Sequence, residues 1–146
     1  MKGRKGKLAH ILLVEDNEGD ILLTKEAFAE VKVKTHISVA RNGKEALDFL
    51  FKRGDYIGVS KPDLILLDIN LPVYNGHEVL EQIKADSILK SIPIIVLTTS
   101  SNKKDIDLAY KNHCNSYVEK PLNLSDFIAA IIKIEQFWLE LTTLKD

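Results

Sequence analysis

The sequence has little cysteine and no long apolar run. Its single cysteine, Cys114, cannot form an internal disulfide, which is typical of a protein that works in a reducing compartment. No stretch approaches the roughly 18 consecutive apolar residues of a membrane span. The apolar segment 11–14, behind the basic residues 1–7, is too short for a secretory signal peptide. We therefore expect a cytoplasmic protein with no membrane partner.

The sequence also lacks an excess of charge of either sign. Lys and Arg number 20 against 21 Asp and Glu, so the formal net charge is −1. Such a chain has no overall positive field to hold a nucleic acid, and we expect none as a partner. The length of 146 residues and the 45% hydrophobic content suffice for one domain with a sizeable core. We predict that domain over residues 8–146, after a disordered basic tail over residues 1–7.

Five short apolar segments alternate with segments of helical periodicity. The apolar segments have the length of β-strands and cover residues 8–14, 36–40, 64–67, 92–97 and 116–118. The pairs Asn42-Gly43 and Asn75-Gly76 are expected to open the second and third helices. The order of these elements predicts five strands that alternate with five helices.

The apolar segments are continuous rather than alternating with polar residues. This pattern indicates strands that are buried on both faces, as in a parallel sheet covered by helices on each side. Right-handed crossovers connect such strands. We predict an α/β fold with a doubly wound, five-stranded parallel sheet and an extended closing helix that begins near residue 124 and ends between 141 and 143.

Polar residues follow four of the predicted strands at the point where each strand ends. In chain order they are Glu15-Asp16, Asp68-Ile69-Asn70, Thr98-Thr99-Ser100 and Glu119-Lys120-Pro121. In an open parallel sheet, the carboxyl ends of the strands border one crevice where ligands bind. We therefore expect these distant segments to meet at one edge.

Three carboxylates, those of Glu15, Asp16 and Asp68, are expected to share this edge. Their repulsion is costly unless a cation or a proton lies among them. Mg²⁺ suits the site because it takes oxygen ligands, uses only one or two carboxylates and keeps waters that a phosphoryl oxygen can replace. Lys120 and Thr98 would add a point charge and a hydroxyl donor for a phosphoryl group.

Asp68 is the central candidate for a reacting group. It follows the apolar segment 64–67, and a carboxylate can act as a nucleophile and form an acyl phosphate. Catalysis would then consist mostly of positioning and charge neutralisation, to which Lys120 and the metal contribute. No separate general base is needed, because the carboxylate is already ionised.

These motifs and their order resemble those of response-regulator receiver domains, the phosphorylatable partners of sensor histidine kinases. The resemblance covers residues 8 to about 134. Its motifs stand here as Leu12-Leu13-Val14-Glu15-Asp16, Leu66-Leu67-Asp68-Ile69-Asn70-Leu71-Pro72 followed by Asn75-Gly76, Leu97-Thr98, and Tyr117 through Lys120-Pro121. The resemblance implies a flavodoxin-like (βα)5 receiver fold.

The resemblance also implies roles for the acidic residues. Asp68 would be the phosphoacceptor. Asp16, Asp68 and the backbone carbonyl of Asn70 would bind Mg²⁺, and Glu15 would contribute through water.

Further roles implied by the resemblance concern the phosphoryl group and the response to it. Thr98 and Lys120 would contact the phosphoryl group. Tyr117 would be the aromatic switch that turns inward when Thr98 moves toward the phosphate. The chain would be a stand-alone response regulator that signals by phosphorylation-dependent contact with an unknown protein. It would catalyse its own phosphoryl transfer and dephosphorylation without being a turnover enzyme.

A narrower resemblance concerns the small receivers that pair with cyanobacterial phytochromes. It rests on residues 70–76 and 97–101 and on the tail after Pro121. It implies a phytochrome-type light sensor as the kinase. Thr99 departs from the alanine that is usual after the switch threonine, which bears on how freely the following loop closes.

Other functions remain open at this point. A flavodoxin-like electron carrier needs an uncharged phosphate-binding loop after the first strand, where Glu15-Asp16 would repel phosphate. A Mg²⁺-dependent aspartyl-phosphate phosphatase would place a second acid two residues after the nucleophile, where Asn70 stands instead. A receiver-like module that binds partners constitutively would be expected to lack one of the acids or the lysine, and none is lost.

The closing helix carries two apolar stripes. One stripe contains residues 127, 131, 134, 138 and 141, and the other contains residues 124, 128, 132 and 139. One face of a sheet cannot cover both stripes. We therefore expect the chain to form a homodimer through this helix, with a monomer that folds the last turns back as the alternative.

Overall fold

The computed structural model describes the backbone of residues 8–141 and the side chains of residues 8–140. The predicted tail over residues 1–7 and the predicted end of the closing helix beyond residue 141 lie outside the described residues. Across residues 8–141, no helix combines the length and the apolar character that crossing a bilayer requires.

Five parallel strands form one sheet in the order β2-β1-β3-β4-β5. They are β1 (Ala9–Val14), β2 (Thr35–Ala40), β3 (Leu64–Leu67), β4 (Ile94–Thr98) and β5 (Ser116–Glu119). The doubly wound parallel fold predicted from the sequence is thereby confirmed. β4 begins two residues later than predicted, at Ile94, because Pro93 has no N–H to give to the ladder.

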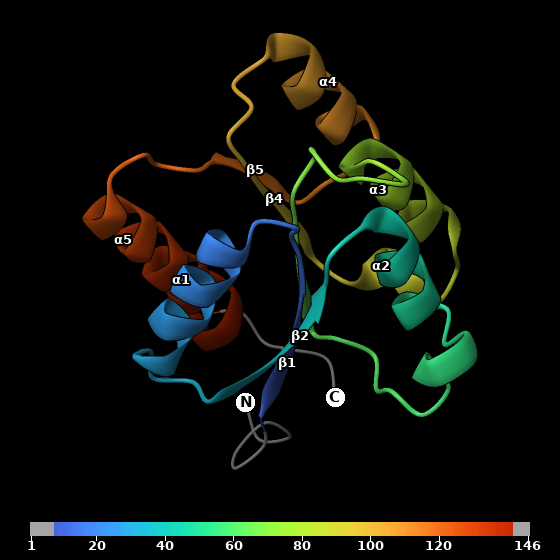
Figure 1. Ribbon diagram of the computed structural model, residues 1–146, viewed down its shortest axis with the longest axis horizontal. Coiled ribbons are helices and arrows are strands. Elements are labelled where there is room, and N and C mark those ends of the chain that lie inside the picture. The colour runs from blue at the N-terminus through green and yellow to red at the C-terminus, as the bar shows by residue number, and fades with distance from the viewer. Residues whose placement is uncertain (1–7, 142–146) are drawn as a thin grey trace.

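Helices cover both faces of the sheet, as Figure 1 shows. α1 (Glu18–Ala29) and α5 (Leu124–Glu135) lie side by side on one face. α2 (Gly43–Leu50), α3 (Gly76–Ala85) and α4 (Lys103–Lys111) lie on the other. The short 3-10 helices η2 (Gly54–Tyr56) and η3 (Leu89–Ser91) lie in connections between these elements.

An asparagine caps the N-terminus of each of these five α-helices. The caps are Asn17, Asn42, Asn75, Asn102 and Asn123. In each, the side-chain oxygen accepts a backbone N–H from the first turn, which satisfies a donor that the helix leaves unpaired. The predicted helix starts at Asn42 and Asn75 are confirmed. These caps begin the helices close to the strand ends, at the edge where the polar motifs lie.

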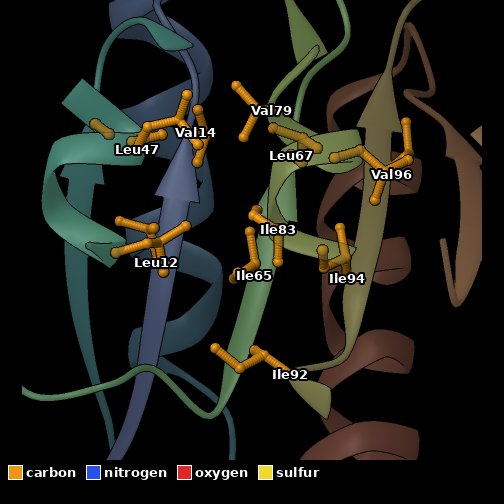
Figure 2. Close-up of a cluster of buried hydrophobic side chains, with 14 of the residues drawn as sticks. Leu12, Val14, Leu47, Ile65, Leu67, Val79, Ile83, Ile92, Ile94 and Val96 are labelled. Carbon is orange, nitrogen blue, oxygen red and sulfur yellow. The ribbon is translucent and has the colours of Figure 1, made fainter. Parts of the chain in front are cut away.

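The apolar strands pack a separate core against each layer of helices. Alternate side chains of a strand point to opposite faces, so Leu12 and Val14 join one core while Ile11 and Leu13 join the other. Figure 2 shows the core toward α2 and α3, where Leu67 and Val79 lie close together. Burial on both faces explains why the strand sequences are continuously apolar.

The closing helix changes its winding before it ends. α5 stops at Glu135 and continues as the π-helical segment η4 (Gln136–Leu141). The two predicted stripes assumed a regular α-helical period, and this assumption is wrong after Glu135. The wider π-helical turn brings Leu139 to 2% exposure, although it belongs to the second stripe, and leaves Phe137 51% exposed.

A carboxyl group is buried at the point where α5 becomes η4. Glu135 is 1% exposed, and its Oε2 accepts the backbone N–H of Val33 at 3.2 Å. Burial raises the pKa of Glu135 to about 7, and a hydrogen bond with Glu140 adds to this effect. The folded protein therefore holds a proton at Glu135 over a pH range in which the unfolded chain releases it.

This proton makes stability depend on pH. Between the ordinary glutamate pKa of 4.5 and about 7, the folded state binds more protons than the unfolded state, so the contribution of Glu135 is lost as pH rises. We expect Glu135→Gln to raise the free energy of unfolding at pH 8 by on the order of 1 kcal/mol, and to have less effect at pH 5. Urea denaturation at both pH values measures this difference. Glu119→Gln, at an exposed position, is the matched control, and equal effects of Glu135→Gln at the two pH values would contradict the assignment.

Candidate functional site

The three carboxylates predicted from the strand ends lie together at one edge of the sheet. Glu15, Asp16 and Asp68 each have a carboxylate oxygen within 4.8 Å of the other two. Glu15 and Asp16 follow β1, and Asp68 follows β3. The backbone N–H of Asp68 donates to the carbonyl of Val14 at 3.0 Å, so the parallel ladder itself brings the two strand ends together.

The three carboxylates differ in their exposure. Glu15 is 3% exposed and Asp68 is 6% exposed, whereas Asp16 faces solvent. Two acidic groups are therefore held out of bulk water. Their charges are screened less in the protein interior than they would be in water. The exposed carboxylate of Asp16 leaves the cluster accessible from outside.

Lys120 inserts its ammonium group among the carboxylates. Its side chain is 5% exposed, and Nζ donates to Glu15 Oε2 and to Asp20 Oδ2, the latter at 2.9 Å. Asp68 Oδ2 lies 3.4 Å from the same nitrogen. The backbone N–H of Lys120 donates to the carbonyl of Thr98 at 2.6 Å, which fixes the start of this side chain beside β4. A buried cation thus bridges three elements of the fold.

Asp20 is a site residue that the sequence analysis missed. It lies in the first turn of α1, and its N–H donates to the capping oxygen of Asn17. An acidic residue in the first turn is common because it interacts favourably with the helix dipole, so it does not by itself indicate a ligand. Its spacing of four from Asp16 gives no helical signal either, because Asp16 precedes the N-cap Asn17 and lies outside α1.

Burial and charge shift the pKa values of this cluster. Burial raises the pKa of Glu15 to about 7, and the charge of Asp68 adds to the rise, although the hydrogen bond from Lys120 opposes it. Burial alone would lower the pKa of Lys120. The hydrogen bonds to Glu15 and Asp20 and the charge of Asp68 outweigh burial and raise that pKa above its ordinary value, so Lys120 is a permanent cation.

Thr98 and Asn70 border Asp68 from two directions. Thr98 ends β4 and is fully buried, and the pairing of Leu67 with Val96 brings the end of β4 beside the end of β3. The backbone N–H of Asn70 donates to Asp68 Oδ1 at 3.2 Å. The structure therefore brings both predicted residues to the surroundings of Asp68.

Gly76 allows the connection between β3 and α3 to return close to Asp68. A Cβ atom at this position would lie 2.3 Å from the carbonyl oxygen of Asp68, so a side chain does not fit. The N–H of Gly76 donates to the carbonyl of Ile69 at 2.9 Å. This close approach gives the Asn75-Gly76 motif a role in shaping the loop that carries Asn70.

Tyr117 lies on β5 and faces the connection between β4 and α4. Its hydroxyl donates to the carbonyl of Ser100 at 2.8 Å, and its ring packs against the core that α2 and α3 share. Ser100 N–H in turn faces Thr98 Oγ1 at 3.4 Å. The two residues predicted to form a switch are thus connected through Ser100.

The chemistry of this donor set fits a hard divalent cation. All nearby acidic ligands offer oxygen, two of them are buried, and one lysine does not neutralise the four carboxylates of Glu15, Asp16, Asp20 and Asp68. Mg²⁺ prefers a few carboxylate oxygens together with waters, which agrees with a cluster that opens to solvent at Asp16.

Comparison with known proteins connects this geometry to a family. The response regulator receiver domain family matches residues 11–132. The chain is 43% identical to response regulator Rcp1 of Synechocystis sp. over 134 residues, which are 92% of this chain and 91% of Rcp1. It is 44% identical to the probable methanogenesis regulatory protein FilR2 of Methanothrix harundinacea over 129 residues, 88% of this chain and 83% of FilR2.

Solved structures of two related proteins are also similar. The phosphorylated cyanobacterial phytochrome response regulator RcpA is 46% identical, with a TM-score of 0.92, and the similarity covers 95% of this chain and 99% of RcpA. The Mn²⁺-bound form of Rcp1 is 42% identical, with a TM-score of 0.91, and the similarity covers 94% of this chain and 99% of Rcp1.

The raised pKa of Glu15 predicts a pH-dependent metal affinity. Because a cation in this cluster favours the ionised form of Glu15, binding below pH 7 is expected to release a proton. We expect Mg²⁺ affinity, measured by titration calorimetry, to rise by up to about tenfold per pH unit from pH 6 and to level off above pH 7. Glu15→Gln should flatten this rise, and Glu119→Gln should not. A flat profile for the unmodified protein would contradict the prediction.

Proposed function

The chain belongs to the response regulator receiver domain family, and we propose that it signals by accepting a phosphoryl group on Asp68 from a sensor histidine kinase. The observation that carries this proposal is the position of Asp68. Its buried carboxylate lies 3.4 Å from the ammonium of Lys120 and within a cluster of further carboxylates. Such an arrangement stabilises extra negative charge at one oxygen while keeping that oxygen nucleophilic.

The transfer involves one bond made and one broken. An oxygen of the Asp68 carboxylate attacks the phosphorus of a phosphohistidine on the kinase, the P–N bond breaks, and the imidazole leaves with its electron pair and takes up a proton. The product is an acyl phosphate. Hydrolysis of the acyl phosphate by water restores the carboxylate, so the chain takes part in its own phosphorylation and dephosphorylation without acting as a turnover enzyme.

Receiver domains bind Mg²⁺ at an acidic cluster, and the cluster of this chain supplies suitable ligands. Asp16, Asp68 and the backbone carbonyl of Asn70 would hold the ion, and Glu15 would contribute through water. When bound, Mg²⁺ neutralises charge that develops on the phosphoryl oxygens. The Mn²⁺-bound form of Rcp1 supports a divalent-cation site in a close relative.

Lys120 and Thr98 would hold the phosphoryl group once it is attached. Lys120 Nζ already lies near Asp68 Oδ2, so it can exchange its bond with Asp20 for one with a phosphoryl oxygen. Thr98 Oγ1 has only the long 3.4 Å contact with Ser100 N–H among its described hydrogen bonds. Its hydroxyl can turn toward the phosphoryl group at little cost.

The similarity to phytochrome response regulators favours a phytochrome-type sensor kinase as the phosphodonor. We propose that the signal leaves the chain by contact with a further protein, in the cytoplasm, where ATP-dependent kinases operate. Phosphorylation adds about −1.5 to −2 charges at Asp68 and thereby shifts an equilibrium between two arrangements of the switch.

Phosphorylation of Asp68 can be tested directly. Incubation with Mg²⁺ and a small-molecule phosphodonor should add one phosphoryl group by intact mass, and Asp68→Asn should abolish the addition because its amide is a poor nucleophile. Asp107→Asn is the matched control, because Asp107 is an exposed acid that pairs with Lys103 on α4.

The other outcomes of this experiment separate the competing functions. No adduct on the unmodified protein would favour a module that binds partners constitutively. Continuous turnover of a phosphomonoester would favour an Asp-dependent phosphatase. Rates of transfer from a panel of autophosphorylated histidine kinases, phytochromes included, would then rank the candidate phosphodonors.

We also propose that two copies of the chain associate through α5, η4 and β5. β5 is an edge strand, and an apolar groove beside it is lined by residues that include Val118, Ile134, Phe137 and Trp138. Phe137 is 51% exposed, and its ring packs against that of Trp138. An edge strand next to exposed aromatic rings is a surface that a second chain can cover.

Sedimentation tests this association. We expect a dimer at tens of micromolar protein, and Phe137→Glu should shift the equilibrium toward monomer by roughly tenfold or more, because it places a charge in the apolar groove. Ile57→Glu is the matched control, since Ile57 is 78% exposed but lies elsewhere. A monomer at high concentration, with and without phosphorylation, would rule the dimer out.

A further inference from the structure

α4 is anchored more weakly than the other α-helices of the described chain. Ala109 is its one buried residue, whereas α3 and α5 each bury four. In Figure 1, α4 projects beyond the end of the sheet, above α3. A helix with so little apolar burial depends on polar contacts for its position.

A chain of hydrogen bonds connects α3 to α4 and to the loop between β4 and α4. His77, in the first turn of α3, places Nε2 2.9 Å from Asp105 Oδ1 on α4. The other oxygen of Asp105 accepts the hydroxyl of Ser100 at 2.6 Å. The two carboxylate oxygens of Asp105 thus connect a residue of α3 with a residue of the loop.

The direction of these bonds follows from the charge of Asp105. The hydrogen bonds from Ser100 and His77 hold the pKa of Asp105 below its usual range, so its oxygens can only accept. His77 Nε2 must therefore carry a proton and donate. His77 is 12% exposed, and its Nδ1 is buried with no hydrogen-bond partner among the described residues. Within the described part of the chain, Nε2 therefore makes the hydrogen bond that orients the ring.

Ser100 transmits this restraint to both residues of the proposed switch. Its carbonyl accepts the hydroxyl of Tyr117 at 2.8 Å, and its N–H faces Thr98 Oγ1. Its side chain is also fixed from the helix side, because Asn102 N–H donates to Ser100 Oγ at 3.3 Å. Movement of Ser100 would therefore move the acceptor that holds Tyr117 against the core.

We propose, resting on the function proposed for Asp68, that His77 is a positioning residue which acts through Asp105 and Ser100 to hold Tyr117 inward before any phosphoryl group arrives. The His77–Asp105–Ser100 bridge biases the switch equilibrium toward the arrangement seen in the structure. A typical intramolecular hydrogen bond changes such an equilibrium by about two- to tenfold. Phosphorylation then requires a smaller conformational change.

The test compares two substitutions of the same residue. His77→Phe keeps a planar ring but removes the donor, whereas His77→Gln supplies an amide N–H that can reach Asp105. The position of Tyr117 is followed by ¹⁹F NMR of protein that contains 3-fluorotyrosine, with the resonance assigned through Tyr117→Phe. Initial phosphorylation rates with Mg²⁺ and a small phosphodonor are measured in parallel. Asp107→Asn is the control, because Asp107 lies on α4, as Asp105 does, but pairs with Lys103.

We expect His77→Phe to lower the ratio of inward to outward Tyr117 by about fivefold and the phosphorylation rate by a similar factor. The final stoichiometry should stay at one phosphoryl group. His77→Gln should restore most of both quantities, and Asp107→Asn should change neither. If His77→Phe does not fold, Ser100→Ala cuts the same bridge at its other end and should give the same shift.

Two outcomes would overturn the role of His77. One is an unchanged Tyr117 resonance in His77→Phe. The other is an equal loss in His77→Phe and His77→Gln, which would show that packing rather than the hydrogen bond matters. If neither the unmodified protein nor any variant takes up phosphate, the function proposed for Asp68 is wrong. The ¹⁹F spectra still decide the role of the bridge in that case.

Discussion

Mutual repulsion among carboxylates at the carboxyl edge of the sheet is the constraint on which the rest of this structure depends. The fold brings Glu15, Asp16 and Asp68 within 4.8 Å of one another and buries two of them. Lys120 offsets part of this charge from inside the cluster, and a divalent cation would offset more. One lysine does not balance the charge of these carboxylates, so their donor set fits a hard divalent cation.

The two apolar cores and the helix caps stabilise the fold against this repulsion among the carboxylates. Strands buried on both faces hold the ends of β1, β3 and β4 in fixed register, so the polar groups that follow them cannot move apart to relieve repulsion. The parts that are held mainly by polar contacts, α4 and the loop before it, lie next to the site. In the proposed function, the charge added at Asp68 would move this weakly anchored part and leave the core in place.

Periodicity and the order of motifs along the chain carried enough information to predict much of the fold and of the site. Continuous apolar segments predicted the parallel sheet, and the residues after each strand predicted which side chains meet. Asp20 was not predicted as a site residue, because an acid in the first turn of a helix has an ordinary explanation. The burial of Leu139 was not predicted either, because no local pattern indicates the change from α-helical to π-helical winding after Glu135.

The sequence by itself determined the fold class, the edge of the sheet at which the polar residues gather, and the family. These follow from patterns that are local or that repeat along the chain, and from the rule that parallel strands end at one edge. Only the tertiary structure decided which partners each charge has. The contact of Lys120 with Asp20 and that of His77 with Asp105 join residues 100 and 28 positions apart, and such pairs are selected by the packing of whole helices rather than by any local preference of the chain.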